Sequence, residues 1–411
     1  MKILILGSGG REHALAWKLA QSTGASIVSA PGNPGMAKLG QIIPVKDGAP
    51  ETFLAIAESV DADLTVVGPE APLVAGVVDL FRAKGRRIVG PDRNAAQLEG
   101  SKIFAKNFFT QSNIPTAQYV VAANESEARG ALSRFGFPVV LKADGLAAGK
   151  GVVVARDRGE AEAALESLQF PLVVEEFLDG REVSFIALCD GRDALPLAPT
   201  QDHKAVFDAD RGPNTGGMGA YCDSCILTGS ETQTVLDTVI RPTVAATRFT
   251  GFLYAGLMMT QWGPKVLEFN VRLGDPETQP LMHRMASDFV PALMAAADGR
   301  VGSEKLEWRA GPSVCVVMTS GGYPGSYAAG KAIRGIEAAE AAGCTVFQAG
   351  TRLGWNGLET AGGRVLGVTA GGTDLPSAIA LAYQGVQRIQ FEGMHFRTDI
   401  GRKGLERYNK V

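Results

Sequence analysis

Apolar runs and amphipathic stretches alternate along roughly the first hundred residues. The spacing predicts a helix over 11–21 and buried strands at 3–6, 26–28, 64–67 and 87–89. This alternation is typical of a doubly wound α/β domain, with a parallel sheet and helices on both faces. Ligands of such domains bind beyond the carboxyl ends of the strands. Glycine-rich or proline-rich turns stand at those ends, at residues 7–10, 31–35, 68–70 and 90–92.

The pattern changes in the middle of the chain. Between about 115 and 180, short strands bounded by glycine or proline alternate with helices predicted at 125–135 and 159–168. A glycine-rich stretch, 201–221, is predicted to be a long connection. A helix near 231–248 and a strand at 265–271 follow.

A third pattern begins after about 310, where strands alternate with many glycines before a last helix near 376–390. We therefore expect three domains. They are an N-terminal α/β domain (1–100), a central domain (101–310) and a C-terminal glycine-rich mixed domain (311–411).

The composition describes a globular chain and excludes several classes of function. Of the 411 residues, 45% are hydrophobic and 20% are charged, and the net charge is −3, so we expect no basic surface for nucleic acid. No apolar stretch reaches the roughly 18 residues of a membrane span, and the first apolar run is too short for a signal peptide. Five irregularly spaced cysteines fit a reducing compartment. We therefore expect a cytoplasmic protein with no nucleic-acid or membrane partner.

The segment Cys222-Asp223-Ser224-Cys225 is an isolated CxxC motif. A zinc site would need two further ligands at partner spacing, and the sequence has no second CxxC. Two thiols in a loop are the favoured interpretation, and a redox or metal role is the alternative.

An apolar strand runs directly into charged residues between 265 and 279. Alternation along a strand would place Val266, Glu268 and Asn270 on one face. Hard oxygen ligands two residues apart suit Mg²⁺, which binds few protein groups and keeps water and phosphate in its shell. The alternative is a half-buried strand whose polar side chains face solvent. A dense charged turn that follows at once, with Arg272, Asp275 and Glu277, favours the metal site.

Two glycine loops are candidate phosphate sites. The turn at 7–10 lies between a strand and a helix, where backbone amides favour an anion. A dinucleotide fingerprint would need glycine where Glu12 stands, so a sugar phosphate beside Arg11 is the better interpretation. His13, in the following helix, is either a substrate contact or a structural residue. The second loop, 144–151, lacks the Ser or Thr of a Walker A motif because Gly151 follows Gly-Lys, and it is either a flap over a triphosphate or an ordinary hairpin.

An acidic hinge, Glu175-Glu176-Phe177-Leu178 followed by Glu182, completes the set. A linker of this kind can offer backbone groups to a purine, and a carboxylate to ribose hydroxyls. In order with Lys142, the 144–151 loop and the strand 268–270, the hinge resembles that of the ATP-grasp ligases.

Within that superfamily the chain resembles the phosphoribosylamine-glycine ligases of purine synthesis, also called glycinamide ribonucleotide synthetases. The motifs that carry the resemblance are Gly9-Gly10-Arg11-Glu12-His13, Val67-Gly68-Pro69-Glu70, Leu98-Glu99-Gly100-Ser101-Lys102, Gln201-Asp202-His203-Lys204, Asn214-Thr215-Gly216-Gly217 and Arg272-Leu273-Gly274-Asp275-Pro276-Glu277. The resemblance implies that the domain at 101–310 is an ATP-grasp domain with a lid subdomain at about 115–180, and that the N-terminal domain (1–100) binds substrate. It also implies a ligation of glycine to 5-phosphoribosylamine, through glycyl phosphate, that consumes ATP.

The same resemblance implies a role for individual residues. The implied catalytic residues are Arg272, Lys150 and Asp275. The implied ATP contacts are Lys102, Lys142, Gly149, Lys150, Gly151, Glu175, Glu176, Leu178 and Glu182. The implied substrate contacts are Gly9, Gly10, Arg11, Glu70, Asp202, Thr215, Gly216, Arg272, Gly274, Asp275 and Glu277. Glu268 and Asn270 would bind the metal, Mg²⁺ or Mn²⁺, since an oxygen site accepts either ion.

The sequence departs from the family pattern at three places. The loop before the Glu-Glu-Phe-Leu hinge is short, Ala205 stands where an arginine is common, and the CxxC replaces a proline-containing loop. Two other functions stay open at this point: another ATP-grasp carboxylate-amine ligase, and a non-catalytic nucleotide-binding or redox protein. We expect a monomer whose partners are ATP, glycine and 5-phosphoribosylamine.

Overall fold

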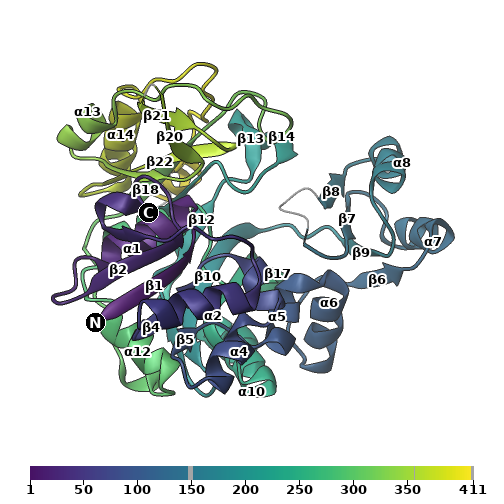
Figure 1. Cartoon of the computed structure of the whole chain (residues 1–411). Coiled ribbons are helices and arrows are strands. Elements are labelled where there is room, and N and C mark those ends of the chain that lie inside the picture. Colours follow the sequence, from purple (N-terminus) through teal and green to yellow (C-terminus); the bar gives the residue numbers. More distant parts are fainter. Residues whose placement is uncertain (147–150, 356, 409–411) are drawn as a thin grey trace.

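A five-stranded parallel sheet forms the N-terminal part of the molecule. Figure 1 shows the computed structural model, which describes residues 1–146, 151–355 and 357–408. The strand order is β3-β2-β1-β4-β5. The strands are β1 (Lys2–Gly7), β2 (Ser26–Pro31), β3 (Gly40–Ile42), β4 (Leu64–Val67) and β5 (Ile88–Val89). The flanking helices are α1 (Gly10–Leu19), α2 (Pro50–Ser59), α3 (Glu70–Val74), α4 (Val77–Ala83) and α12 (Val290–Ala297).

Both faces of this sheet are buried, which explains why its strands are continuous apolar runs. Leu4 and Leu6 pack in one hydrophobic cluster, with residues of α2, α3 and α4. Ile3 and Ile5 point the other way and pack with residues of α1 and α12. The prediction of a doubly wound parallel sheet is therefore confirmed.

A long antiparallel sheet forms the centre and continues into the C-terminal part. Its order is β17-β16-β10-β12-β15-β18-β22-β19, with β11 paired to β10. Its strands are β10 (Arg181–Asp190), β11 (Ala194–Pro196), β12 (Thr200–Asp202), β15 (Gly219–Cys222), β16 (Thr250–Thr260), β17 (Gly263–Asn270), β18 (Ser313–Thr319), β19 (Thr345–Gln348) and β22 (Arg364–Gly371). Because β15 pairs with β18, the hydrogen-bonded sheet runs across position 310, where the sequence pattern changes.

The segment from 119 to 176 forms a small body that projects from the rest of the molecule (Figure 1). A four-stranded sheet of order β6-β9-β7-β8 carries two helices, and a separate hydrophobic cluster fills its interior. Its elements are β6 (Tyr119–Ala122), α7 (Glu125–Phe135), β7 (Val139–Ala143), β8 (Val152–Ala155), α8 (Arg158–Ser167) and β9 (Leu172–Glu176). We call this body the lid sheet.

The remaining elements connect and cover these sheets. They are α5 (Arg93–Gly100), α6 (Lys102–Gln111), β13 (Ala205–Phe207), β14 (Arg211–Asn214), α9 (Gly229–Val235), α10 (Arg241–Thr247), α11 (Thr278–Arg284), α13 (Ile336–Ala341), β20 (Thr351–Gly354), β21 (Gly357–Thr360), α14 (Leu375–Val386) and α15 (Arg402–Tyr408). None of the helices in the described ranges is long and apolar enough to cross a bilayer.

The interpretation of 201–221 as a connection was wrong. This segment holds β13, β14 and most of β12 and β15. Its sequence is polar and rich in glycine, so it has no apolar alternation to indicate strands. Thr200, Gln201 and Asp202 are nevertheless buried, because β12 lies between two other strands of the central sheet.

Gly251, at the start of β16, sets the contact between the central and N-terminal sheets. Its φ is +83°, and a Cβ atom there would lie 2.6 Å from the Cα of Gly90. Gly263 offers a matched control, because its φ is +104° and no atom lies within 4 Å of its Cβ position.

We expect Gly251→Ala to lower the free energy of unfolding by about 2–5 kcal/mol. This sum combines the cost of an alanine in the left-handed backbone region with the cost of overpacking against Gly90. Gly263→Ala should cost only about 1–2 kcal/mol, the conformational part alone. Urea denaturation of the two variants measures the difference, and equal losses would contradict a tight contact at Gly90.

Candidate active site

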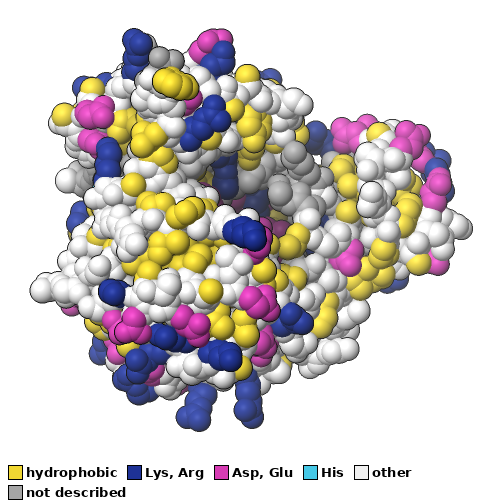
Figure 2. All heavy atoms as spheres, viewed as in Figure 1, with side chains coloured by type: hydrophobic (Ala, Val, Ile, Leu, Met, Phe, Trp, Pro, Cys, Tyr) yellow, Lys and Arg dark blue, Asp and Glu magenta, His cyan; other side chains and the backbone are white. Residues whose placement is uncertain are grey.

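A cavity of about 680 Å³ lies where the lid sheet, the central sheet and both terminal parts meet. Figure 2 shows the surface hollowed between the lid sheet and the rest of the molecule. The cavity is lined by all of the predicted site residues that the structure describes, apart from Gly9 and Gly10. Gly149 and Lys150 lie outside the described residues.

Strand β17 carries the two predicted metal ligands into this cavity, but with a different side-chain pattern from the one expected. Gly256 pairs with Glu268 while Leu257 pairs with Val266, so Leu267 forms a bulge. Val266 is fully buried in the core, and Glu268 and Asn270 line the cavity. The expectation that Val266 shares their face was wrong, because a bulge shifts strand alternation by one residue.

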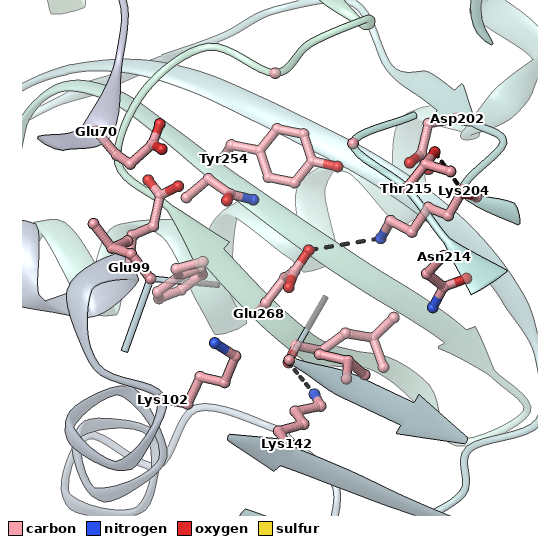
Figure 3. A pocket seen from close by; sticks show the side chains of 18 of the residues that line it. Glu70, Glu99, Lys102, Lys142, Asp202, Lys204, Asn214, Thr215, Tyr254 and Glu268 are labelled. Atoms are coloured by element: carbon pink, nitrogen blue, oxygen red, sulfur yellow. Dashed lines mark hydrogen bonds and ion pairs between the residues drawn. The ribbon is translucent and has the colours of Figure 1, made fainter. Parts of the chain in front are cut away.

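Glu268 lies at the centre of a ring of cations (Figure 3). The ammonium of Lys204 lies 3.6 Å from its carboxylate. Burial raises the pKa of Glu268, but Lys204, Lys142 and Lys102 outweigh burial and hold the pKa below its usual value. Glu268 is therefore ionised at neutral pH.

An ionised carboxylate and an amide oxygen fit a hard cation that keeps water and phosphate oxygens in its shell. No group of three or more His, Cys, Asp or Glu side chains suited to a metal occurs within the described ranges. The donor set therefore suits a metal that arrives with a phosphate ligand better than a resident structural ion.

Glu175 is buried between two lysines at the inner end of the cavity. Its carboxylate forms ion pairs with Lys106 and Lys142, and Lys142 also donates to the carbonyl of Leu267 at 2.9 Å. Burial lowers the pKa of Lys106 to about 8, although Glu175 opposes that shift. Sequence reasoning missed Lys106, which lies one helical turn after Lys102 on α6.

The hinge at the end of β9 offers backbone groups to the cavity, because the carboxylate of Glu176 already accepts hydrogen bonds from other residues. Glu176 accepts hydrogen bonds from the backbone N–H of Gln118 and from Lys265, both at 3.0 Å. Leu178 is largely buried and packs with Met258. This arrangement leaves an apolar slot edged by backbone groups, which suits a flat heterocycle.

Arg272 is bound mainly by two carboxylates of the N-terminal part. Its guanidinium lies 2.7 Å from Glu99 and 3.3 Å from Glu70, and Nη1 donates to the carbonyl of Leu273 at 3.2 Å. Burial raises the pKa of Glu99 despite this arginine. Glu99 was quoted in a motif but not assigned a role, and only the fold brings it beside Arg272.

Lys204 lies between Glu268 and a second acidic group. Its backbone carbonyl accepts two hydrogen bonds from Thr215, both at 2.8 Å, which fixes the position of the residue. The pKa of Lys204 lies well above its usual value because of Asp202 and Glu268. Burial raises the pKa of Asp202 to about 7, and Lys204 opposes that rise. Beyond them, Tyr254 donates to Glu277 at 2.8 Å.

Asp275 is tied to the C-terminal part through Arg364. Nη2 of Arg364 lies 3.0 Å from the Asp275 carboxylate, and Nη1 donates to the carbonyls of Asp275 and Gly216 at 2.7 and 2.5 Å. Burial raises the pKa of Asp275, but Arg364 and Arg11 hold it below its usual value. No sequence motif pointed to Arg364, which lies 89 residues after Asp275.

The first glycine turn differs from the free anion site that its sequence indicates. The N–H of Gly9 donates to Glu12 at 2.6 Å, so a side chain of the same chain already uses this amide. Glu12 also pairs with Arg11 at 2.6 Å. Of the turn's predicted contacts Gly9, Gly10 and Arg11, only Arg11 lines the cavity.

Comparisons with known proteins point to one family along nearly the whole chain. Models described as Phosphoribosylglycinamide synthetase match residues 1–99 (N domain), 100–278 (ATP-grasp (A) domain) and 313–403 (C domain). The chain is 48% identical to a phosphoribosylamine-glycine ligase of Ralstonia nicotianae, over 99% of this chain and 100% of that protein. It is 50% identical to one of Allochromatium vinosum, over 99% of each. The crystal structure of a phosphoribosylamine-glycine ligase of Thermotoga maritima has a TM-score of 0.85 at 35% identity, covering 97% of this chain and 100% of that one.

His13 lies outside the cavity and joins helix α1 to the C-terminal part. Its Nδ1 accepts the N–H of Gln348 at 2.8 Å, and its ring meets Phe347 edge to face. Burial lowers its pKa from 6.5 to about 4. The neutral ring is therefore part of the fold, which favours the structural interpretation.

Between pH 6.5 and pH 4, His13 is mostly protonated in the unfolded chain but mostly neutral in the folded protein. The free energy of unfolding therefore falls as the pH is lowered through this window. Between pH 7 and 5 we expect His13 to contribute a loss of about 2 kcal/mol. Urea denaturation at both pH values checks this. His13→Gln, whose amide oxygen can accept the same N–H, should reduce the loss by that amount, and an unchanged loss would contradict a neutral buried His13.

Proposed function

The chain belongs to the phosphoribosylglycinamide synthetase family, and from this premise we propose that the central cavity ligates glycine to 5-phosphoribosylamine in two steps. The enzyme is a phosphoribosylamine-glycine ligase of purine biosynthesis, as its full-length relatives are. One observation carries the site proposal. A single cavity holds an ionised Glu268 ringed by lysines and, beside it, the acidic group Asp202, Asp275 and Glu277.

The nucleotide is proposed to lie between the lid sheet and β17. Backbone groups at Glu176 and Leu178 bound the adenine, Glu182 binds the ribose, and Gly151 belongs to the flap over the phosphates. Lys102 and Lys142 neutralise the phosphates, and Glu175 orients Lys142. The Lys102 ammonium donates to the carbonyl of Gly145 at 2.8 Å and forms no ion pair with a described carboxylate, so it is available to a phosphate. Gly149 and Lys150 of the same loop are proposed ATP contacts from the family resemblance alone.

Glu268 and Asn270 are proposed to hold Mg²⁺ or Mn²⁺. Bound there, the ion would neutralise phosphate charge and align the γ-phosphoryl group. The described protein groups supply two oxygen donors, which leaves most of its shell to phosphate and water.

In the first step, a carboxylate oxygen of glycine attacks the γ-phosphorus, the bond from that phosphorus to the bridging oxygen breaks, and ADP leaves. Two anions must approach each other, so a cation has to lie between them. Lys204 is the cation next to Glu268, and its charge is secured by Asp202. We therefore assign the glycine carboxylate to Lys204. Arg272, whose guanidinium is bound by Glu70 and Glu99, orients these groups and stabilises the acyl phosphate.

In the second step, the amine of 5-phosphoribosylamine attacks the carbonyl carbon of glycyl phosphate, and the bond to the phosphate oxygen breaks. The nitrogen loses one proton, and inorganic phosphate leaves. Asp202 is placed to accept that proton, since its pKa lies near neutrality. Asp275 and Glu277 hold the ammonium group of glycine and the sugar hydroxyls.

The ribosyl phosphate is proposed to lie toward the two terminal parts. Arg11 of the N-terminal part and Arg364 of the C-terminal part both line the cavity there, as do Thr215 and Gly216, and Arg364 donates to the carbonyl of Gly216 at 2.5 Å. Gly9 and Gly10 then act by supporting Arg11, and Glu70, Arg272 and Gly274 complete the wall.

We further propose a monomer that works in the cytoplasm. One chain supplies all of the roles above, and the five irregularly spaced cysteines of the sequence suit a reducing compartment.

The ligase proposal predicts that purified protein releases ADP from ATP only when glycine and phosphoribosylamine are both present. A coupled ADP assay over a panel of amino acids and amines measures this. Turnover with another amino acid but not with glycine would refute the substrate assignment and support a different carboxylate-amine ligase.

Lys204→Met is expected to lower kcat/KM for glycine by about 100-fold, the usual effect of removing one charge-stabilising group from a transition state. ATP affinity should stay within about threefold, because Lys102 and Lys142 remain. Steady-state kinetics with glycine varied, and equilibrium binding of ATP, separate the two effects.

Lys305→Met, at an exposed position away from the cavity, is the matched control and should behave as wild type. If Lys204→Met left kcat/KM for glycine unchanged while Arg272→Met abolished it, the carboxylate would belong to Arg272.

A further inference from the structure

A second cavity, of about 330 Å³, lies at the C-terminal end of helix α11. Helix α11 begins directly after the charged turn at 272–277. The second cavity is therefore one short helix away from the proposed active site. His283 and Arg284 line it from α11, Arg309 and Ser313 from the segment leading into β18, and Gly371 from the end of β22. It therefore lies where the central and C-terminal parts meet.

Arg284 is a buried cation at the last position of helix α11. Only 5% of the residue is exposed. Its Nε donates to the carbonyls of Arg309 and Gly311 at 3.2 and 2.9 Å, and Nη1 contacts the sulfur of Cys222 at 3.7 Å. No carboxylate among the described residues forms an ion pair with it. A buried charge is costly unless a counter-charge accompanies it.

Other cations add to the positive charge of this region. Arg309 is exposed at the cavity and also forms no ion pair within the described ranges. Lys18 is 5% exposed and donates to the carbonyl of Met285 at 2.8 Å. Burial, followed by Arg309, lowers the pKa of both Lys18 and His283. Asp288 acts on the Lys18 pKa in the opposite sense, whereas Arg284 and Arg309, which both line the cavity, form no ion pair with a described carboxylate.

The cavity also has neutral donors and open space. The hydroxyl of Ser313 lies 3.0 Å from Nδ1 of His283 and 3.4 Å from the carbonyl of Ala370, and it can rotate to donate to a ligand instead. Gly343 lines the cavity without a side chain, and the nearest atom to its Cβ position is 3.9 Å away.

We propose that this cavity binds a phosphate group, either inorganic phosphate or the phosphate of a small monoester. Two guanidinium groups and a hydroxyl match the oxygens of a tetrahedral dianion. The bound anion supplies the counter-charge that Arg284 lacks, and it links α11 to the strands β18 and β22. The site is separate from the substrate phosphate in the catalytic cavity.

The test uses the stacking of Trp17 on His283, whose ring centroids lie 6.1 Å apart. Inorganic phosphate and, in a second arm, adenosine monophosphate are titrated into the full-length protein at constant ionic strength, while tryptophan fluorescence and titration calorimetry are recorded. We expect saturable binding that Arg309→Gln and Arg284→Met each weaken at least tenfold. Trp17→Phe should remove the fluorescence signal but not the heat.

Arg334→Gln, an exposed arginine outside both cavities, is the matched control. Lys102→Met controls for phosphate bound in the catalytic cavity, and neither control variant should change the affinity of the second cavity. Tighter binding of adenosine monophosphate identifies a monoester as the occupant, and equal or weaker binding identifies the inorganic ion.

Absence of binding in both arms would overturn the proposal, as would wild-type affinity in Arg309→Gln. That exposed variant decides the question even if Arg284→Met does not fold. Because none of these readouts depends on ligation, failure here leaves the ligase proposal intact.

Discussion

The site depends on one electrostatic constraint, the confinement of Glu268 among three lysines. A carboxylate so enclosed would take up a proton unless positive charge opposed its burial. Lys102 comes from helix α6, Lys142 from the lid sheet and Lys204 from the segment after β12, so three separate parts of the fold hold one anion in its charged form. Each of these lysines also faces the space where phosphate charge would be transferred. The same arrangement therefore keeps Glu268, the proposed metal ligand, ionised and gives the cavity the positive charge that a polyanion requires.

The turn that follows β17 extends this principle to the rest of the molecule. Arg272 is bound by Glu70 and Glu99 of the N-terminal part, and Asp275 is bound by Arg364 of the C-terminal part. The turn therefore has ionic contacts on both sides, which fixes it more firmly than its glycine and proline residues could. The two terminal parts are thereby components of the active site as well as neighbours of it. A second cation-rich cavity at the other end of helix α11 suggests that this helix is also fixed by charge at its far end.

Some elements were predictable because their physics is local. The strand at 3–6 is apolar on both faces because helices cover both faces of its sheet, and this signal is complete within the segment. The helix predicted at 125–135 has the same bounds in the structure, since Asn124 caps its first turn through Glu127 and Gly136 ends it. Strand β12 was missed because its polar residues are buried only by neighbouring strands. The bulge at Leu267 was missed because register is a property of a pair of strands.

The sequence by itself determined the order of the chemical groups: a lysine strand, a glycine loop, an acidic hinge, and a strand with Glu268 and Asn270 that runs into a charged turn. Side-chain type and spacing are carried by the chain, so these groups and the family they indicate could be identified without coordinates. The tertiary structure alone decided which charges meet. Lys106 and Lys142 pair with Glu175, Arg364 pairs with Asp275, and Gly9 gives its amide to Glu12 and leaves the cavity to Arg11. The physical reason is that electrostatic interactions depend on distance and burial, and both are set by contacts between residues far apart in the chain.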